Sequence, residues 1–202
     1  MDGLTWMQCS TTGPAIRVEH AMAYDSARKK TVLFGGYNTY ARSLLGDTWE
    51  WDGLAWTLIS DTGPSPRNYH AMAYDSTRGR LVLFGGYNSS GDQGDTWEWD
   101  GLNWILLSTT GPRPRQHHSM AFDPVRHRVV LFGGNYYENG FYRLGDTWEW
   151  DGTSWIQRTT LGPSARGDST MAYDSVRDRI VLVGGDPSFG VSVDTWEWNG
   201  TW

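Results

Sequence analysis

Cysteine is nearly absent from this sequence: Cys9 is the only one, so the chain can form no internal disulfide. Long apolar runs are lacking too, and none approaches the ~20 residues that a membrane-spanning helix requires. The N-terminus has no basic region followed by an apolar one, so no signal peptide is expected. These absences predict a soluble chain without a membrane partner, and they leave its cellular compartment unknown.

Basic residues are not in excess either. The chain has 17 Lys and Arg against 23 Asp and Glu, a formal net charge of −6. Nucleic-acid binding normally needs a basic face, so no nucleic-acid partner is expected. Helical spacing of apolar residues is not sustained anywhere, and 25 glycines and 8 prolines argue further against helices.

Tryptophan, in contrast, is abundant, with 13 copies. The stretch GDTWEWDG occurs at 46–53, 94–101 and 145–152, and VDTWEWNG follows at 193–200. Its carboxylates resemble an acidic site, but we interpret it as scaffold. Trp49 and Trp51 share one strand face and would pack between sheets, and Asp52–Gly53 is a hairpin turn. We expect Asp47 to accept backbone donors and Glu50 to pair with a repeated arginine.

An internal repeat organises the whole chain. A tryptophan after a D-G or N-G turn recurs every 47 to 51 residues, at Trp6, Trp56, Trp104, Trp155 and Trp202. Between these positions the same elements follow in order: G-P with an arginine, an MAYD-like segment, VLFGG or VLVGG, and DTWEW. Each unit predicts four short strands, called A to D here, and four-stranded units of this period are typical of a β-propeller.

The double glycine after an apolar strand, followed by two spaced aromatic residues, resembles the kelch repeat. The double glycines are Gly35-Gly36, Gly85-Gly86, Gly133-Gly134 and Gly184-Gly185. The resemblance implies an all-β, kelch-type propeller with strand A nearest the axis. We expect a single domain, 1–202, with repeats at about 2–51, 52–99, 100–150 and 151–198 and the start of a fifth at 199–202.

The two ends of the chain raise the question of ring closure. The sequence begins at a fourth strand and ends after a third, which predicts four four-stranded blades with the N-terminal strand completing the last blade. Kelch rings commonly contain five to seven blades, so two alternatives stay open. Two chains could exchange terminal strands to form a homo-oligomer, or the chain is a slice of a longer propeller.

The candidate binding face is predicted from loop lengths. The A–B and C–D turns barely vary, whereas the B–C loops differ greatly and lie with the D–A segments on the other side. The kelch resemblance implies a mouth lined by the arginine that opens strand A and by residues after the double glycine. The candidate binding residues are Arg17, Arg67, Arg115, Arg166, Tyr37, Asn38, Tyr87, Asn88, Asn135, Tyr136, Tyr142, Arg143 and Asp186, with Tyr40, Arg42, Tyr137, Phe141 and Phe189 from the longer loops.

Other interpretations weaken parts of this set. An arginine repeated in every unit is more typical of a structural hydrogen-bonding element than of recognition. His20, His70 and His118 share one repeat position and are weak candidates for a metal site, because Ser169 interrupts the series and no ligand spacing supports it. No cofactor is expected.

We therefore predict a non-enzymatic binding or assembly module whose B–C and D–A loops bind a protein, a peptide or a glycan. One alternative is a carbohydrate-active enzyme in which Arg67, His70, Arg115 and His118 act as acid–base groups or substrate clamps. The other is a truncated or engineered propeller piece whose role is self-assembly into a ring.

Overall fold

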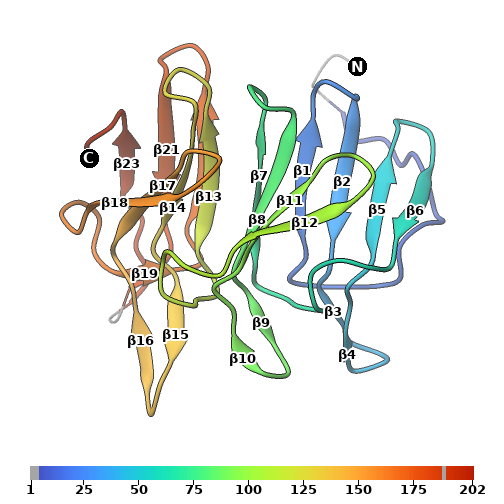
Figure 1. Cartoon of the computed structure of the whole chain (residues 1–202), viewed down its shortest axis with the longest axis horizontal. Coiled ribbons are helices and arrows are strands. Elements are labelled where there is room, and N and C mark those ends of the chain that lie inside the picture. Colours follow the sequence, from blue (N-terminus) through green and yellow to red (C-terminus); the bar gives the residue numbers. More distant parts are fainter. Residues whose placement is uncertain (1–4, 188–189) are drawn as a thin grey trace.

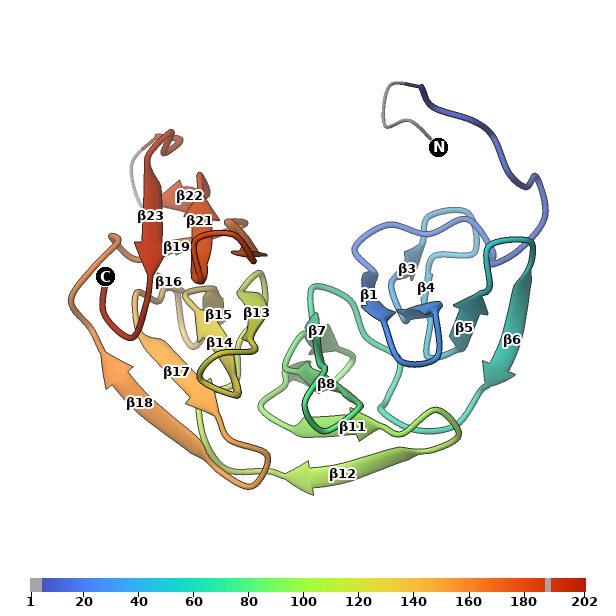
Figure 2. The same cartoon turned by 90° about the horizontal axis from the view of Figure 1, so that it is seen from above.

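A computed structural model describes residues 5–187 and 190–202. The described chain consists of strands, turns and loops, and none of it forms a helix that could span a membrane. Four β-sheets stand side by side like blades along an arc, with their first strands on the inside (Figures 1 and 2). This is a β-propeller arrangement of four blades, as the sequence predicts.

Each blade is an antiparallel sheet whose strands follow the chain order from the inside outwards. The first blade contains β1 (Ala21–Asp25), β2 (Lys30–Phe34), β5 (Thr48–Trp51) and β6 (Trp56–Ser60). The second contains β7 (Ala71–Asp75), β8 (Arg80–Phe84), β11 (Thr96–Trp99) and β12 (Trp104–Ser108). The third contains β13 (Ser119–Asp123), β14 (Arg128–Phe132), β17 (Thr147–Trp150) and β18 (Trp155–Thr159). The fourth contains β20 (Thr170–Asp174), β21 (Arg179–Val183) and β23 (Thr195–Trp198).

Small hairpins project from the same side of the first three blades (Figure 1). They are formed by β3 (Tyr37–Asn38) with β4 (Ser43–Leu44), β9 (Tyr87–Asn88) with β10 (Gly91–Asp92), and β15 (Asn135–Tyr137) with β16 (Phe141–Arg143). In the fourth blade β19 (Arg166–Gly167) pairs with β22 (Asp186–Pro187). The variable B–C loops therefore share one side with the D–A segments, and we call this side the hairpin face.

The double glycine turns the chain from the blade into the hairpin. Gly85 has φ +67°, and a Cβ there would lie 2.6 Å from the carbonyl oxygen of Arg115 in the next D–A segment. Both the left-handed backbone and the close approach of a neighbouring main chain require glycine. The motif thus marks where consecutive blades touch.

The hydrophobic core lies between the blades. Phe84 and Val82 of the second blade pack against Met120, Leu131 and Trp150 of the third, and all five side chains are buried. The interpretation of DTWEW as scaffold is confirmed at this interface, because Trp148 packs in the same cluster. A buried tryptophan removes a large apolar area from water.

The acidic residues of that motif are partly as expected. Glu50 pairs with Arg28 of the repeated A–B turn at 2.5 Å, as predicted. The expectation for Asp47 needs correction, because its carboxylate is held by side chains. It accepts two hydrogen bonds from Arg17, each 2.8 Å, and one from the indole of Trp49 at 2.6 Å.

The prediction that the N-terminal strand completes the last blade of the same chain is wrong. The fourth sheet has three strands, β20, β21 and β23, and the arc is open in Figure 2. Residues 5–10 form no strand, and Trp6 is fully exposed. The N-terminal segment runs beside the first blade, at the opposite end of the arc from β23 (Figure 2).

Candidate functional site

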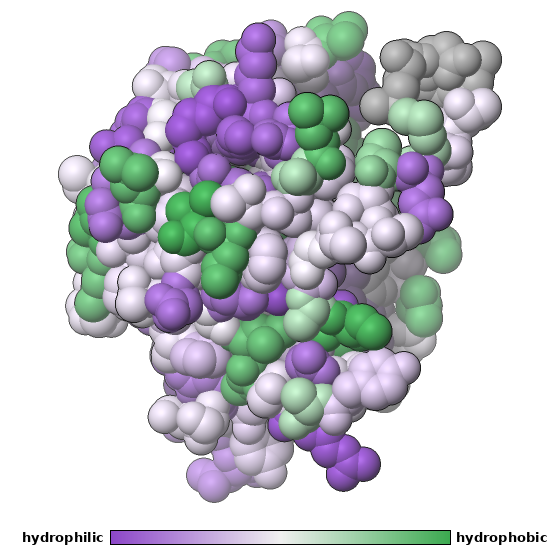
Figure 3. Space-filling view, turned by 90° about the vertical axis from the view of Figure 1, so that its right-hand side faces the viewer, coloured by the Kyte–Doolittle hydropathy of each residue, from purple (hydrophilic) through white to green (hydrophobic). Residues whose placement is uncertain are grey.

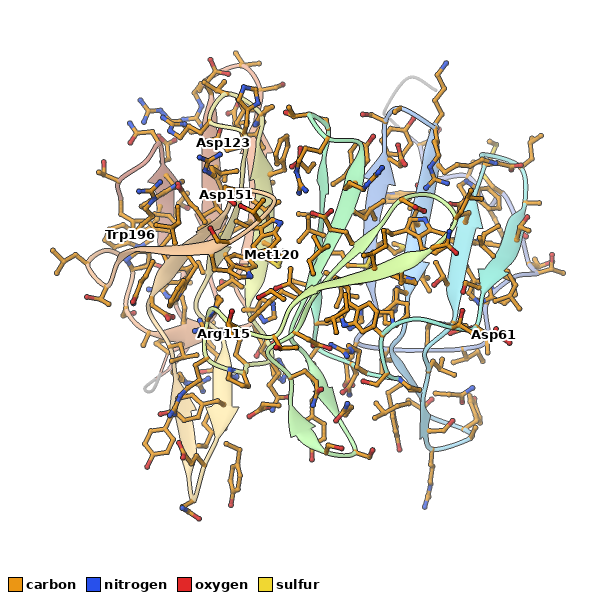
Figure 4. All side chains as sticks on the ribbon, viewed as in Figure 1. Asp61, Arg115, Met120, Asp123, Asp151 and Trp196 are labelled. Carbon is orange, nitrogen blue, oxygen red and sulfur yellow. The ribbon has the colours of Figure 1, made fainter. Side chains whose placement is uncertain are left out.

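The four repeated arginines lie inside the protein at the hairpin end of each blade, where Arg115 is labelled in Figure 4. Arg115 is fully buried and donates to the carbonyl oxygens of Arg113 and Gly133, each at 2.9 Å. It also donates hydrogen bonds to both carboxylate oxygens of Asp146, at 2.7 and 2.9 Å.

The other three arginines repeat this arrangement: Arg17 with Asp47, Arg67 with Asp95 and Arg166 with Asp194. Their guanidinium N–H groups already donate to aspartates and carbonyl oxygens of the protein, so these arginines have a structural role. An anionic ligand would find no free fork at these positions.

The histidines at 20, 70 and 118 also face inward. His70 and His118 are each 6% exposed and lie edge-on to Phe34 and Phe84 of the preceding blade. Burial lowers the pKa of His70 to about 3 and that of His118 well below its usual value, and a neighbouring arginine acts in the same direction. Both imidazoles are therefore neutral near pH 7. Within residues 5–187 and 190–202, no three His, Cys, Asp or Glu side chains are grouped so as to hold a metal ion.

The predicted loop residues separate into supporting and exposed groups. Asn88 and Asn135 are buried, and Asn88 donates to Ser65 at 2.8 Å while accepting from Ser90. Arg143 joins two blades by donating to Asn135 at 3.2 Å and to Asp186 at 2.6 Å. These side chains hold the hairpins in place.

Solvent is reached by the side chains of Tyr40, Tyr87, Tyr137, Phe141 and Tyr142, and in part by those of Tyr37, Asn38, Tyr136 and Asp186. Phe189 lies outside the described residues.

One cavity, of about 360 Å³, opens between the second and third hairpins. Ser90, Gly91 and Asp92 line one side, Tyr136, Tyr137 and Glu138 the other, and Arg113 and Pro114 the base. The Tyr137 backbone amide donates to Asp92 Oδ2 at 2.7 Å and ties the two hairpins together. Burial raises the pKa of this Asp92 carboxyl.

An aromatic stack lies beside this hairpin cavity. The ring of Tyr136 lies 5.0 Å from that of Tyr142 at an angle of 14°, and the Arg113 guanidinium carbon lies 4.1 Å from the Tyr136 centroid. Arg113 also pairs with Glu138 at 2.9 Å. Cation–π and stacking contacts of this kind rigidify the rings. Tyr142 is 48% exposed, and Tyr137 and Phe141, which pair with each other in the same hairpin, are 69% and 55% exposed.

A second group lies at the inner edge of the arc, where Glu19, Tyr69, His117 and Asp168 occupy equivalent positions. All four have left-handed backbones with φ between 56° and 61°. The backbone amides of Tyr69, His117 and Asp168 each donate to the carbonyl oxygen of the preceding member, at 2.9 to 3.1 Å. Tyr69 stacks on His117 with centroids 3.8 Å apart, and His117 Nδ1 lies 2.5 Å from Asp168 Oδ1.

This inner row lines a cavity of about 270 Å³ together with the buried histidines. Burial and the Glu19 carboxylate raise the pKa of Tyr69 to about 12, so its hydroxyl stays protonated at neutral pH. The hydrogen bond from His117 lowers the pKa of Asp168, although burial opposes it. The row therefore presents a carboxylate at each end.

Sequence reasoning missed Arg113, Glu138, Asp92 and the inner row. A usable signal existed, because the inner-row residue changes from Glu to Tyr, His and Asp within an otherwise regular repeat. The position of these residues at the inner edge of the arc depends on a left-handed backbone conformation, which their residue types do not predict. Arg113 carries no such signal, because only the arginine at position 115 repeats in every unit.

The architecture and the hairpin face define a β-propeller with a loop-built surface at one end of its blades. A family model described as the KLHDC2/KLHL20/DRC7 Kelch-repeats domain matches residues 1–185. The chain belongs to the kelch-repeat family. Domains of this family are generally non-catalytic modules that bind proteins. No curated protein matches the chain.

Proposed function

We propose that this protein binds a segment of a partner protein on the hairpin face, with the aromatic stack and the adjoining hairpin cavity as the centre of the site. The observation that carries the proposal is the gathering of aromatic side chains on the third hairpin: Tyr136 and Tyr137 line the cavity with Arg113, Tyr142 stacks on Tyr136, and Phe141 lies against Arg143. Tyrosine and arginine are enriched at the energetic centres of protein interfaces, because they combine large contact area with polar groups.

The chemistry favours a segment that inserts an apolar or aromatic side chain. The repeated arginines, which the sequence offers as candidate binding residues, are engaged by aspartates, as Arg115 is by Asp146. Groups exposed at the rim are the carboxylates of Glu138 and Asp186 and the guanidinium of Arg113. A mixed-charge rim around exposed rings suits a peptide whose apolar anchor is flanked by polar residues.

An enzymatic role draws no support from the geometry of its candidate groups. Arg67 and Arg115 are locked in ion pairs, and His70 and His118 are buried and held neutral. A general acid or base must reach the substrate's proton, and these imidazoles are covered by the neighbouring blade. We therefore do not assign a reaction to these residues.

The test is selection of displayed random peptides on the wild-type protein, followed by affinity measurements on variants. We expect Tyr142→Ser and Phe141→Ser to weaken the selected peptides at least ~30-fold, the effect of losing an interface hot spot of about 2 kcal/mol. Val125→Ser is the matched control, because Val125 is 55% exposed in the A–B turn of the same blade, away from the hairpins.

Two outcomes contradict the proposal. One is that no peptide is enriched on the wild-type protein over an unrelated propeller. The other is that Val125→Ser weakens the selected peptides as much as Tyr142→Ser does. If no peptide binds but a glycan from a panel does, and Tyr142→Ser abolishes that binding, the ligand of this face is a glycan and not a peptide.

A further inference from the structure

The third hairpin, β15 with β16, has one strand that faces away from the other hairpins. Its strands have three residues each, whereas those of the first and second hairpins have two. β15 contacts β10 of the second hairpin, and β16 lies on the side away from β10 (Figure 1). The outer edge of β16, here called the open edge, therefore borders the hairpin face beyond the aromatic stack.

The ladder between β15 and β16 determines which main-chain groups point to the open edge. The backbone amide of Leu144 donates to the carbonyl oxygen of Gly134 at 2.8 Å. Hydrogen-bonded pairs recur every two residues in an antiparallel ladder, so the next one joins Tyr142 and Tyr136, which face each other in the register. The residues on either side of Tyr142 therefore point their N–H and C=O groups away from β15.

The opposite edge of the hairpin, that of β15, follows the same alternation and is paired. Asn135 points its main-chain groups away from β16, and it exchanges two hydrogen bonds with Gln116, at 2.7 and 2.9 Å. The Tyr137 amide points the same way and donates to Asp92 Oδ2 at 2.7 Å. The edge of β15 is thus occupied by the neighbouring D–A segment and the second hairpin.

The open edge has no such partner in the part of the chain that the structure describes. There the backbone N–H and C=O groups of Phe141 and Arg143 form no hydrogen bond. In the fourth blade, which follows along the arc, β22 pairs with β19 and not with β16. The side chain of Phe141 is 55% exposed. The four main-chain groups are therefore available to a further strand.

The side chains of β16 suit such an addition. Proteins commonly protect strand edges with proline, lysine or free charges, and β16 contains neither proline nor lysine. Its one charged residue, Arg143, is engaged by Asp186 at 2.6 Å and by Asn135 at 3.2 Å. The rings of Tyr136 and Tyr142 stack across the two strands at 14°, so the second face of the Tyr142 ring is turned toward the open edge. Tyr142 is 48% exposed.

The first hairpin offers no comparable surface. Its outer strand, β4, has two residues, and Leu44 alone points its main-chain groups outward, because the next residue, Leu45, donates back to Gly36 at 2.8 Å. Hydrophobic patches at the first-blade end of the molecule lie over the blade, whereas the hairpin at the bottom of that view is mostly hydrophilic (Figure 3). An open edge beside stacked rings is thus a feature of the third hairpin.

We propose that the partner segment binds as an extended strand added antiparallel to β16, with an apolar or aromatic anchor residue opposite Tyr142. This inference rests on the proposed function and specifies how the segment is held. The two residues that flank the anchor exchange main-chain hydrogen bonds with Phe141 and Arg143. The anchor lies in a non-hydrogen-bonded pair with Tyr142, where the Cα atoms are about 4.5 Å apart and cross-strand side chains pack closely.

The test is a double scan of the displayed peptides that the wild-type protein selects. In one series each backbone amide of the peptide is N-methylated in turn, and in the other each side chain is replaced by alanine. N-methylation is expected to weaken binding at least ~10-fold at the two flanking residues, because it removes a donor that faces the open edge, and less than ~3-fold at the anchor. Alanine is expected to show the reverse pattern, with a loss of at least ~10-fold at the anchor.

Amide hydrogen exchange, followed by NMR, measures the same contact on the protein without any substitution. Saturating peptide is expected to slow exchange of the Phe141 and Arg143 amides at least ~10-fold, because both become hydrogen-bonded. The Tyr137 amide is the control, because it already donates to Asp92 in the free protein. Its exchange rate is expected to change little.

The outcomes separate this inference from the proposed function. If no peptide is enriched, the proposed function fails and strand addition fails with it. If peptides bind and Tyr142→Ser weakens them, but N-methylation of the flanking residues has no effect or acts equally at every position, the proposed function stands and strand addition is refuted. Protection of the Phe141 and Arg143 amides in the free protein that disappears on dilution would assign the open edge to a second copy of this chain and overturn the proposal.

Discussion

The substitution Arg115→Met tests the conclusion that the repeated arginines are structural. It removes the donors that reach the carbonyl oxygens of Arg113 and Gly133 and both oxygens of Asp146. The Asp146 carboxylate, 14% exposed, is left with one indole donor from Trp148 at 2.7 Å. Removing one partner of a buried ion pair costs about 3–5 kcal/mol, because the other charge stays buried without compensation.

Urea unfolding followed by tryptophan fluorescence measures this loss. Arg113→Met is the matched control, because Arg113 is 46% exposed and pairs with Glu138, which is 63% exposed. A surface pair of this kind contributes about 0–1 kcal/mol. We expect Arg115→Met to lower the free energy of unfolding by at least ~2 kcal/mol more than Arg113→Met does.

A double variant isolates the cause. If the buried charge is what destabilises Arg115→Met, adding Asp146→Asn removes that charge and restores part of the lost stability. Equal losses in Arg115→Met and Arg113→Met would refute the reasoning. The reasoning would also be refuted if Asp146→Asn lowered the free energy of unfolding of the Arg115→Met protein as much as it lowers that of the wild-type protein.

The remaining predictions concern the backbone and pH. Gly85→Ala should destabilise the protein by about 2–4 kcal/mol, because the new Cβ would lie 2.6 Å from the carbonyl oxygen of Arg115. Gly53→Ala should cost about 1 kcal/mol, because no atom lies within 4 Å of its new Cβ. Thermal unfolding of the two variants measures the difference. Burial would raise the pKa of Asp95 and Asp146, but Arg67 and Arg115 hold it below its usual value. Because the pKa of these two carboxyls is lower in the folded protein, the stabilisation that they contribute is present above the unfolded pKa of about 3.9 and is lost as pH falls through the folded pKa. The urea midpoint should therefore stay constant down to about pH 4 and decrease at lower pH. A constant midpoint from pH 4 to pH 2 would contradict this linkage.

Prediction from the sequence succeeded where the repeat alone decides the structure. The period of the tryptophans, the alternation in TWEW and the double glycines determine the strands and their stacking, because each depends on neighbouring residues or on the next copy. The confirmed pairing of Glu50 with Arg28 belongs to the same class, since both residues recur at one spacing. The variable loops also emerged on one side as expected.

The tertiary structure decided what the repeat leaves open. Whether Arg115 faces a ligand or an aspartate depends on where its side chain lies, and burial beside Asp146 settles this in favour of the ion pair. The place of Trp6 depends on the distance between the ends of an arc, a quantity set by the packing of four blades. The sequence by itself therefore determined the blade and its repetition, through local periodicity. Only the assembled arc decided which residues are left exposed at its ends and on its hairpins, because exposure results from contacts between residues about 50 positions apart.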